Sequence, residues 1–279
     1  MRYAAVRCLI AMFIVVGSGC GRVTHDFSLP NQTTAKEPSD MTAETETGTD
    51  LPREDYFTAP LTPEEVAELP AGTRIDTEGR EESFLAACFT EAQISDTIFA
   101  EMKGRSYKDD CDVPLTDLRY CRVLYSGFDG KTYIGELVVS AQISGDILEI
   151  FRALYDAQYP IGKMVLVDEY GGDDNSSMAD NNTSAFNYRT VNGTTTLSRH
   201  SLGLAIDIIP LYNPWIYERD GKTVIDPPAG AEYADRTLDC PYYLTGEDLC
   251  TRLFLQHGFT WGGNWVGSKD YQHFSKEIA

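Results

Sequence analysis

The sequence predicts an α+β fold with a central, mostly antiparallel sheet flanked by helices. Several capped helical segments and several short apolar strands occur along the chain, two of these strands around an Asp-Gly turn. They do not alternate as βαβ units would, which argues against a parallel sheet. Hydrophobic residues make up 42% of the 279 residues and aromatic residues 11%, enough for a substantial core. We find no internal repeat.

The helical segments begin at residues that commonly cap helices. Thr62-Pro-Glu-Glu65 has the pattern of a helix start. Ser144 is expected to cap a helix that reaches residue 156, and Thr245 one that reaches residue 256 and stops at Gly258. Two further short helices are predicted over residues 81–87 and 95–102.

Strands are predicted from short apolar or alternating segments. Residues 121–127 and 131–140 form a predicted hairpin, because Asp129-Gly130 between them favours the positive φ angles of a tight turn. The polar stretch 170–184 is predicted to be a loop. Further strands are expected over residues 163–168, 186–189, 204–209 and 271–274.

The first twenty residues have the features of an export signal. Arg2 and Arg7 give the segment a positive start. The apolar run that follows, over residues 8–16, is short for a membrane span. Gly17-Ser-Gly-Cys20 resembles the lipobox of bacterial lipoproteins, in which the cysteine is acylated. We therefore expect a protein outside the cytoplasm, anchored to the membrane through a lipid on Cys20. A plain secretory signal or an uncleaved anchor are the alternatives.

Residues 21–60 are rich in Thr, Ser, Pro, Asp and Glu and are predicted to be a disordered tether. The expected folded part then consists of an N-terminal helical lead-in over residues 61–119 and a main domain over residues 120–279. The net charge of −20 argues against binding to nucleic acid, because a polyanion would be repelled. The sequence does not indicate an oligomeric state.

Five cysteines follow Cys20, and outside the cytoplasm they can pair. Their spacing contains no Cys-x-x-Cys pair, which argues against a cysteine metal site. The nearest couples along the chain are Cys111 with Cys121 and Cys240 with Cys250, which leaves Cys88 unpaired.

Two short segments hold three candidate metal ligands. His200 and Asp207 lie in Ser198-Arg-His-Ser-Leu-Gly-Leu-Ala-Ile-Asp207, and His273 ends Asp270-Tyr-Gln-His273. The chain has only four histidines, and two of them fall in these segments. Two imidazoles and one carboxylate leave a fourth tetrahedral position open for water, as in hydrolytic zinc sites.

The strand predicted over residues 204–209 would direct Asp207 towards the metal. Because side chains alternate along a strand, Ile206 points into the core and Asp207 to the opposite face, where Ala205 leaves space. Gly203 is expected to let the backbone turn so that His200 lies over the strand. A buried aspartate is costly unless it is paired or bound to a metal, which favours the metal site.

Other residues near these segments are candidates for catalysis and substrate binding. Asp270 is placed to act as general base on a metal-bound water. Arg189 is a candidate to polarise the scissile carbonyl or to stabilise the oxyanion of the tetrahedral intermediate. Trp261 and Trp265 flank Gly262-Gly263 and are expected to form a pocket wall, with core packing as the alternative. His257, near a helix end, is expected to be structural.

The combined motifs resemble the zinc D-alanyl-D-alanine carboxypeptidase family, whose fold is shared with the hedgehog N-terminal domain. The resemblance covers about residues 120–274. The residues that carry it are Asn181-Asn-Thr-Ser-Ala-Phe-Asn-Tyr-Arg189, Ser198-x-His200-x-x-Gly203-x-Ala205-x-Asp207, Trp261-Gly-Gly-x-Trp265 and Asp270-x-x-His273.

The resemblance implies a role for each matched residue. His200, Asp207 and His273 would bind Zn²⁺, and Asp270 would be the catalytic acid/base, a position where many relatives have glutamate. Ser198 would orient the substrate near its terminal carboxylate.

The implied activity is removal of a terminal D-Ala from peptidoglycan stem peptides by the domain over residues 120–279. Cleavage inside the stem peptide at an L-Ala–D-Glu bond is one alternative. A zinc-containing wall-binding module without catalysis is another.

Overall fold

The computed structural model describes residues 61–191 and 193–278. The predicted signal over residues 1–20, its lipobox and the tether over 21–60 lie outside the described residues. Within the described ranges, no helix combines the length and apolar character needed to cross a membrane. The structure has helices and antiparallel sheets, so the predicted α+β class is confirmed.

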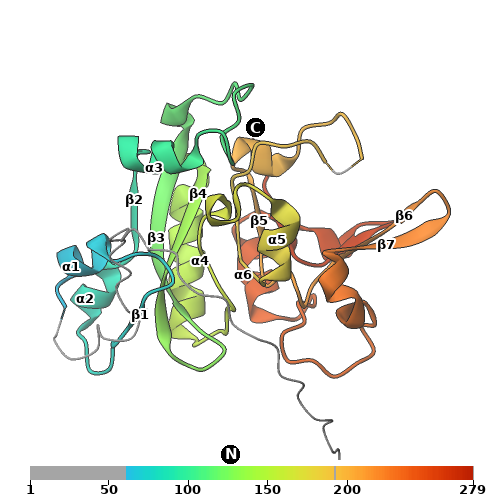
Figure 1. The fold of residues 1–279 in the computed structure, drawn as a ribbon. Helices are drawn as coiled ribbons and strands as arrows, with labels where there is room; N and C mark the ends of the chain where they lie inside the picture. The colour runs from blue at the N-terminus through green and yellow to red at the C-terminus, as the bar shows by residue number, and fades with distance from the viewer. Residues whose placement is uncertain (1–60, 192, 279) are drawn as a thin grey trace, which may run out of the picture. The chain divides into compact units, whose positions relative to one another are not determined.

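The larger sheet has four antiparallel strands in the order β1-β4-β3-β2 (Figure 1). Its centre is the predicted hairpin, in which Leu118 pairs with Ser140 at one end and Ser126 with Thr132 at the other. Gly130 in the turn has a φ of 71°, as expected for an Asp-Gly turn. The strands are β1 (Arg74–Ile75), β2 (Thr90–Ala92), β3 (Leu118–Ser126) and β4 (Thr132–Ser140).

Helix α4 (Ser144–Asp156) packs against β3 and carries one apolar face into the main core (Figure 1). Ile147, Phe151 and Leu154 on this face are buried. The helix was predicted correctly, but the cap was not. Ile143 is the N-cap, and Ser144 is the first helical residue, whose hydroxyl donates a hydrogen bond to the Ala141 carbonyl.

Three short helices precede the hairpin: α1 (Pro63–Glu68), α2 (Glu82–Ala87) and α3 (Asp96–Met102). Thr62 caps α1 in a capping box with Glu65, and Ser95 caps α3, so these predicted starts are confirmed. Helices α1 and α2 pack on the sheet residues Leu124 and Ile134. The segment predicted as a helical lead-in also contributes β1 and β2 to the sheet.

The C-terminal part contains two small antiparallel sheets, ordered β5-β10-β8 and β7-β6-β9. The first consists of β5 (Ala205–Asp207), β8 (Thr260–Trp261) and β10 (His273–Ser275). The second consists of β6 (Trp215–Arg219), β7 (Lys222–Asp226) and β9 (Lys269–Asp270). Figure 1 shows the β6–β7 hairpin projecting at the right, and its Asp220-Gly221 turn was not used in the sequence prediction.

Two helices and five short 3-10 helices complete the described elements of residues 61–191 and 193–278. The helices are α5 (Asp174–Ala179) and α6 (Leu249–Gln256). The 3-10 helices are η1 (Leu115–Asp117), η2 (Val167–Tyr170), η3 (Arg199–Leu202), η4 (Pro228–Ala234) and η5 (Gly262–Asn264).

Two predicted strands, over residues 163–168 and 186–189, are wrong. Both segments contain buried residues, but their backbone groups bond to scattered partners and form no continuous ladder with one neighbouring strand. Val165 N–H donates to Asn182 Oδ1 at 2.9 Å and Leu166 N–H to Glu136 Oε1 at 3.3 Å. In the second segment, successive amides of Phe186, Asn187 and Tyr188 donate to three different partners, the carbonyls of Val138, His200 and Ser106.

Other boundaries differ from the predictions. Residues 170–184 are not a continuous loop, because Asp173 caps α5 there. Helix α6 begins at Leu249, since Asp248 and not Thr245 provides the cap by accepting from the Cys250 N–H. Strand β5 is shorter than the predicted 204–209, and β10 starts two residues later than predicted.

The described cysteines are all free thiols, so the pairs Cys111–Cys121 and Cys240–Cys250 are not formed. Cys121 and Cys250 are fully buried in the main core. Cys111, in contrast, lies beside the smaller cluster around Met102 and Val138, and Cys240 is half-buried. Cys111 and Cys121 therefore belong to different clusters of the fold.

Asp146 of α4 connects this helix to the C-terminal part. Its carboxylate accepts from Lys276 Nζ at 2.7 Å and lies 3.1 Å from His257 Nδ1, which gives His257 a structural contact. Burial alone would raise the pKa of Asp146, but the hydrogen bonds from Lys276 and His257 lower it.

Asp146→Asn is expected to destabilise the protein at neutral pH, and the effect should disappear in acid. A lowered pKa in the folded state stabilises the protein above the pKa of the unfolded chain, about 4, and this stabilisation is lost as the pH falls through the folded value. Urea unfolding of both proteins from pH 7 to pH 3 measures the difference in free energy of unfolding. A difference that stayed constant over this range would contradict the assignment.

Candidate active site

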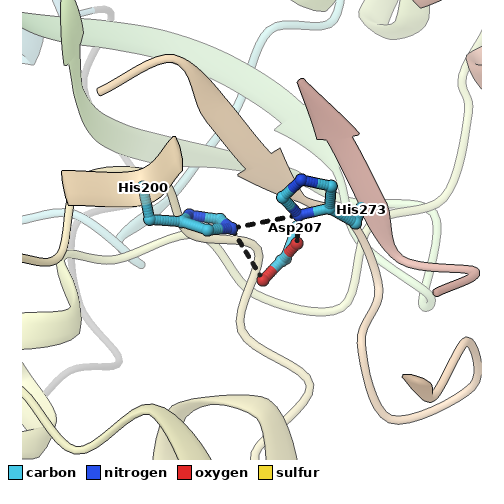
Figure 2. Close-up of side chains that lie close together, drawn as sticks. All are labelled: His200, Asp207 and His273. Carbon is cyan, nitrogen blue, oxygen red and sulfur yellow. Dashed lines mark hydrogen bonds and ion pairs between the residues drawn. The ribbon is translucent and has the colours of Figure 1, made fainter. Parts of the chain in front are cut away.

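The three predicted metal ligands lie together, although they come from three separate elements (Figure 2). His200 is on η3, Asp207 ends β5 and His273 begins β10. Asp207 and His273 are direct cross-strand partners, so their side chains share one face of the sheet. The next pair, Ile206 and Phe274, faces the core, as the predicted alternation of β5 requires.

The three ligand residues lie close enough together to bind one metal ion, with each Asp207 oxygen next to a different imidazole. His200 Nε2 lies 3.2 Å from His273 Nδ1 and 3.2 Å from Asp207 Oδ2, and His273 Nδ1 lies 3.1 Å from Asp207 Oδ1. Tetrahedral zinc with ligand bonds of about 2.0–2.1 Å has ligand–ligand separations of about 3.3 Å. All three side chains are buried. The residues present therefore fit one metal ion.

The backbone around His200 fixes the direction of its ring. His200 Nδ1 lies 2.6 Å from the Ala185 carbonyl oxygen, to which it donates, so Nε2 carries the lone pair that faces the cluster. Ser198 caps η3, and its hydroxyl accepts from the His200 N–H at 3.3 Å. Gly203 ends η3 with a φ of 65° and returns the chain to β5, as predicted.

The electrostatics keep a negative charge at the centre of the cluster. Burial would raise the pKa of Asp207, but the neighbouring His200 and His273 lower it. Burial would lower the pKa of His200, but the Asp207 carboxylate outweighs this effect and raises it. The carboxylate thus stays ionised, which is the form that binds a metal ion.

Asp270 lies on β9 beside the cluster, with its side chain at the wall of the same cavity. Its Oδ1 is buried and has no hydrogen-bond partner in the described structure. Burial raises the pKa of Asp270 to about 8, with a further contribution from the charge of Asp207. A carboxyl group in this environment is suited to exchange protons, as expected for a general base.

Arg189 lies at the cavity and forms an ion pair with Asp174, in which Arg189 Nη2 is 2.6 Å from Asp174 Oδ2. Arg189 Nε is buried and no acceptor for it is found among the described residues. Sequence reasoning does not identify Asp174, which lies on α5 within the predicted loop 170–184. This ion pair holds the guanidinium beside the cluster.

The remaining predicted substrate-binding residues have different locations. Ser198 and Trp265 line the cavity, and the Trp265 ring lies 5.4 Å from that of His273. Trp261 does not line the cavity. It is buried in the main core, where Nε1 donates to the Tyr271 carbonyl, so the packing alternative describes it. Gly262 permits close approach, because a Cβ there would lie 2.4 Å from the Asp270 carbonyl oxygen.

The cavity around the cluster has a volume of about 660 Å³. One of its walls comes from the β6–β7 sheet, which sequence reasoning did not predict. Trp215 of β6 belongs to this wall, and Gln272, between β9 and β10, also lines the cavity. Each has a buried polar atom without a partner in residues 61–191 and 193–278. The Asp220-Gly221 turn was a signal for the hairpin, but nothing in the sequence indicated that its base would reach the cavity.

Gly203→Ala is expected to lower the free energy of unfolding by about 2–4 kcal/mol, because it combines a left-handed φ with close packing. A Cβ at Gly203 would lie 2.5 Å from the Ser140 amide nitrogen. Gly145→Ala is the matched control, since nothing lies within 4 Å of its Cβ position and its φ is not positive. Denaturant unfolding of both variants tests this, and equal stabilities would contradict the role of Gly203.

Two histidines and a carboxylate beside a buried, unpartnered aspartate define a site of the kind used by metal-dependent hydrolases. Comparison with known proteins agrees with this class. The family model described as D-alanyl-D-alanine carboxypeptidase matches residues 192–276, which contain the three candidate ligands and Asp270. This match supports the predicted family and a hydrolase of the peptidase type. No curated protein and no solved structure matches the chain.

Proposed function

We propose that this protein is a zinc-dependent peptidase that removes the terminal D-alanine from peptidoglycan stem peptides. One observation carries the proposal. His200, Asp207 and His273 cluster closely enough to bind one metal ion in a cavity that also contains Asp270, within the segment that matches the peptidase family.

The donor set favours zinc, which two imidazole nitrogens and a carboxylate oxygen commonly bind. When bound, zinc would supply a Lewis acid and a water of lowered pKa. The three ligands would hold it, and the hydrogen bond from His200 to the Ala185 carbonyl would keep that imidazole in the ligating tautomer.

Asp270 would move the proton during hydrolysis. Its carboxylate would take a proton from the attacking water as the water oxygen bonds to the scissile carbonyl carbon. It would then give that proton to the amine nitrogen as the carbon–nitrogen bond breaks. The unpartnered Oδ1 supports this role, because it has no competing hydrogen bond in the described structure.

Arg189 and Ser198 would bind the substrate. Asp174 holds Arg189 by Nη2, and we assign the Nε–H of Arg189 to the carbonyl oxygen on which charge develops. Ser198 lines the same cavity, and we assign its hydroxyl to the terminal carboxylate of the substrate. Trp265 would contact the peptide at the cavity edge.

Cleavage inside the stem peptide, at an L-Ala–D-Glu bond, is the second candidate. The cavity of about 660 Å³ has room for residues on both sides of a scissile bond, as such a cleavage requires. A zinc-containing wall-binding module without catalysis is disfavoured, since such a site has no need for the buried carboxyl of Asp270.

A digest of muropeptide pentapeptide by the zinc-loaded protein tests these functions. Mass spectrometry that detects free D-Ala supports the carboxypeptidase. An internal fragment supports the endopeptidase. Absence of any product from protein that contains stoichiometric zinc contradicts both and favours the binding module.

We further propose that the protein works outside the cytoplasm, held to the membrane by a lipid on Cys20 with residues 21–60 as a tether to the wall. The signal-like segment and lipobox-like motif at residues 17–20 support this location. Metabolic labelling with a fatty acid should label the wild-type protein but not Cys20→Ser. Equal labelling of both proteins would contradict a lipid at this residue.

A further inference from the structure

Two polar atoms in the cavity wall have no function in the chemistry described so far. They are Trp215 Nε1 and Gln272 Oε1, both buried and both without a hydrogen-bond partner in the part of the chain that the structure describes. Gln272 is only 2% exposed. Buried polar atoms are almost always hydrogen-bonded, so an unpartnered donor and acceptor in one cavity are available to bind a group that enters it.

Both side chains lie at the base of the β6–β7 hairpin, next to the catalytic elements. Trp215 of β6 is the cross-strand partner of Asp270 on β9 and of Asp226 on β7. Gln272 follows Asp270 by two residues, directly before the ligand His273. The Gln272 side chain lies beside this strand pair, because its Nε2 is 3.4 Å from the carbonyl oxygen of Asp226, the β7 partner of Trp215.

The chemistry of the two atoms requires a group that both accepts and donates a hydrogen bond. An indole Nε1–H only donates a hydrogen bond. Gln272 Nε2 is directed at the Asp226 carbonyl, so Oε1 is the atom left to the cavity, and it only accepts. One donor and one acceptor together complement a secondary amide, which offers one carbonyl oxygen and one N–H. An anion would lack a donor for Gln272, and a cation would lack an acceptor for Trp215.

We propose that Trp215 and Gln272 form a subsite that binds a second peptide bond of the substrate, next to the scissile one. Trp215 donates to the carbonyl oxygen of this bond, and Gln272 accepts from its N–H. The inference rests on the proposed peptidase function and adds a requirement to it. The enzyme discriminates against free D-Ala-D-Ala, whose single amide is the one cleaved.

The kinetic test compares two substrates with the same scissile bond. One is N-acetyl-D-Ala-D-Ala, and the other is its analogue with the acetylated nitrogen replaced by oxygen, which lacks the N–H. The wild-type kcat/KM is expected to be about 10- to 100-fold lower for the ester analogue, because Gln272 Oε1 is left unpaired. In Gln272→Met the ratio of the two substrates is expected to fall close to one.

Two further variants complete the test. Trp215→Phe keeps an aromatic ring but removes the donor, and is expected to lower kcat/KM on the acetylated dipeptide about 10-fold. Tyr217→Phe is the matched control in the same strand, because Tyr217 stacks on Trp215 but does not line the cavity. It is expected to leave the substrate ratio unchanged. A ratio that is the same in the wild type and Gln272→Met would overturn the subsite.

A binding measurement tests the subsite without turnover. The chain has three tryptophans, so the indole region of a ¹⁵N-correlated NMR spectrum holds three side-chain signals. Addition of N-acetyl-D-Ala-D-Ala to the zinc-loaded Asp270→Asn protein is expected to shift the Trp215 indole signal downfield. Trp261 is the internal control, because it already donates to the Tyr271 carbonyl.

The two failures are distinguishable. If the wild type hydrolyses no peptide but the Trp215 signal shifts, the peptidase function fails and the subsite holds. If peptides are cleaved but the Trp215 signal does not move at millimolar peptide, the subsite is wrong and the function holds.

Discussion

Replacement of Asp270 by asparagine is expected to lower kcat/KM by about 10²- to 10⁴-fold, the range that general acid–base catalysis contributes, while bound zinc is unchanged. The asparagine side chain has nearly the same shape but does not accept a proton at neutral pH. Asp270 is not one of the three clustered ligand residues, so its loss does not remove a metal ligand. The measurement pairs steady-state kinetics on a stem peptide with metal analysis of the same protein.

The control for this change is the variant Asp146→Asn. Asp146 lies on α4, pairs with Lys276 and does not line the cavity. It is expected to keep the wild-type turnover at neutral pH. If Asp270→Asn turned over substrate as fast as the wild type, Asp270 would not be the base. If it lost zinc together with activity, the residue would belong to the metal site instead.

The sequence predicted those parts of the fold whose signals are local. The capping box of Thr62 and Glu65 set the start of α1, and Asp129-Gly130 set the turn between β3 and β4. These signals work because the hydrogen bonds involved lie within a few residues of each other. The Asp220-Gly221 turn carries the same information for β6 and β7, and the prediction did not use it.

The failed predictions depended on contacts between distant residues. Apolar character over residues 163–168 indicated a buried segment, and its Met164 and Leu166 are buried. No local signal, however, indicated that its amides would bond to the side chains of Asn182 and Glu136 in place of a strand. The start of α6 shows a similar limit, because Thr245 and Asp248 are both residue types that cap helices.

The candidate site was more predictable than the fold around it. The ligands could be identified because a metal site requires particular residue types, and these stand in two short segments. The cross-strand pairing of Asp207 with His273 then brings the segments together. The proposed subsite of Trp215 and Gln272 was not predictable in this way. Both are ordinary residue types, and the pairing of β6 with β9 brings them to the cavity.

Replacement of His200 by alanine is expected to abolish stoichiometric zinc binding and with it the activity. Of the three protein ligands, only Asp207 and His273 would remain in this variant. The ligand that is lost is the imidazole that the Ala185 carbonyl orients. His257→Ala is the matched control, because His257 contacts Asp146 and does not line the cavity. It is expected to retain zinc and activity.

Thermal unfolding with and without a chelator gives a second measurement of the same site. Metal at 100 times its Kd stabilises the folded state by about 2.7 kcal/mol. For a folded part of this size, that corresponds to a fall in Tm of about 5–10 °C on removal of zinc. The fall is expected in the wild type and in His257→Ala but not in His200→Ala, because only the last has no metal to lose. A wild type whose Tm does not respond to a chelator or to added Zn²⁺ would contradict the metal site, and the hydrolytic mechanism depends on that site.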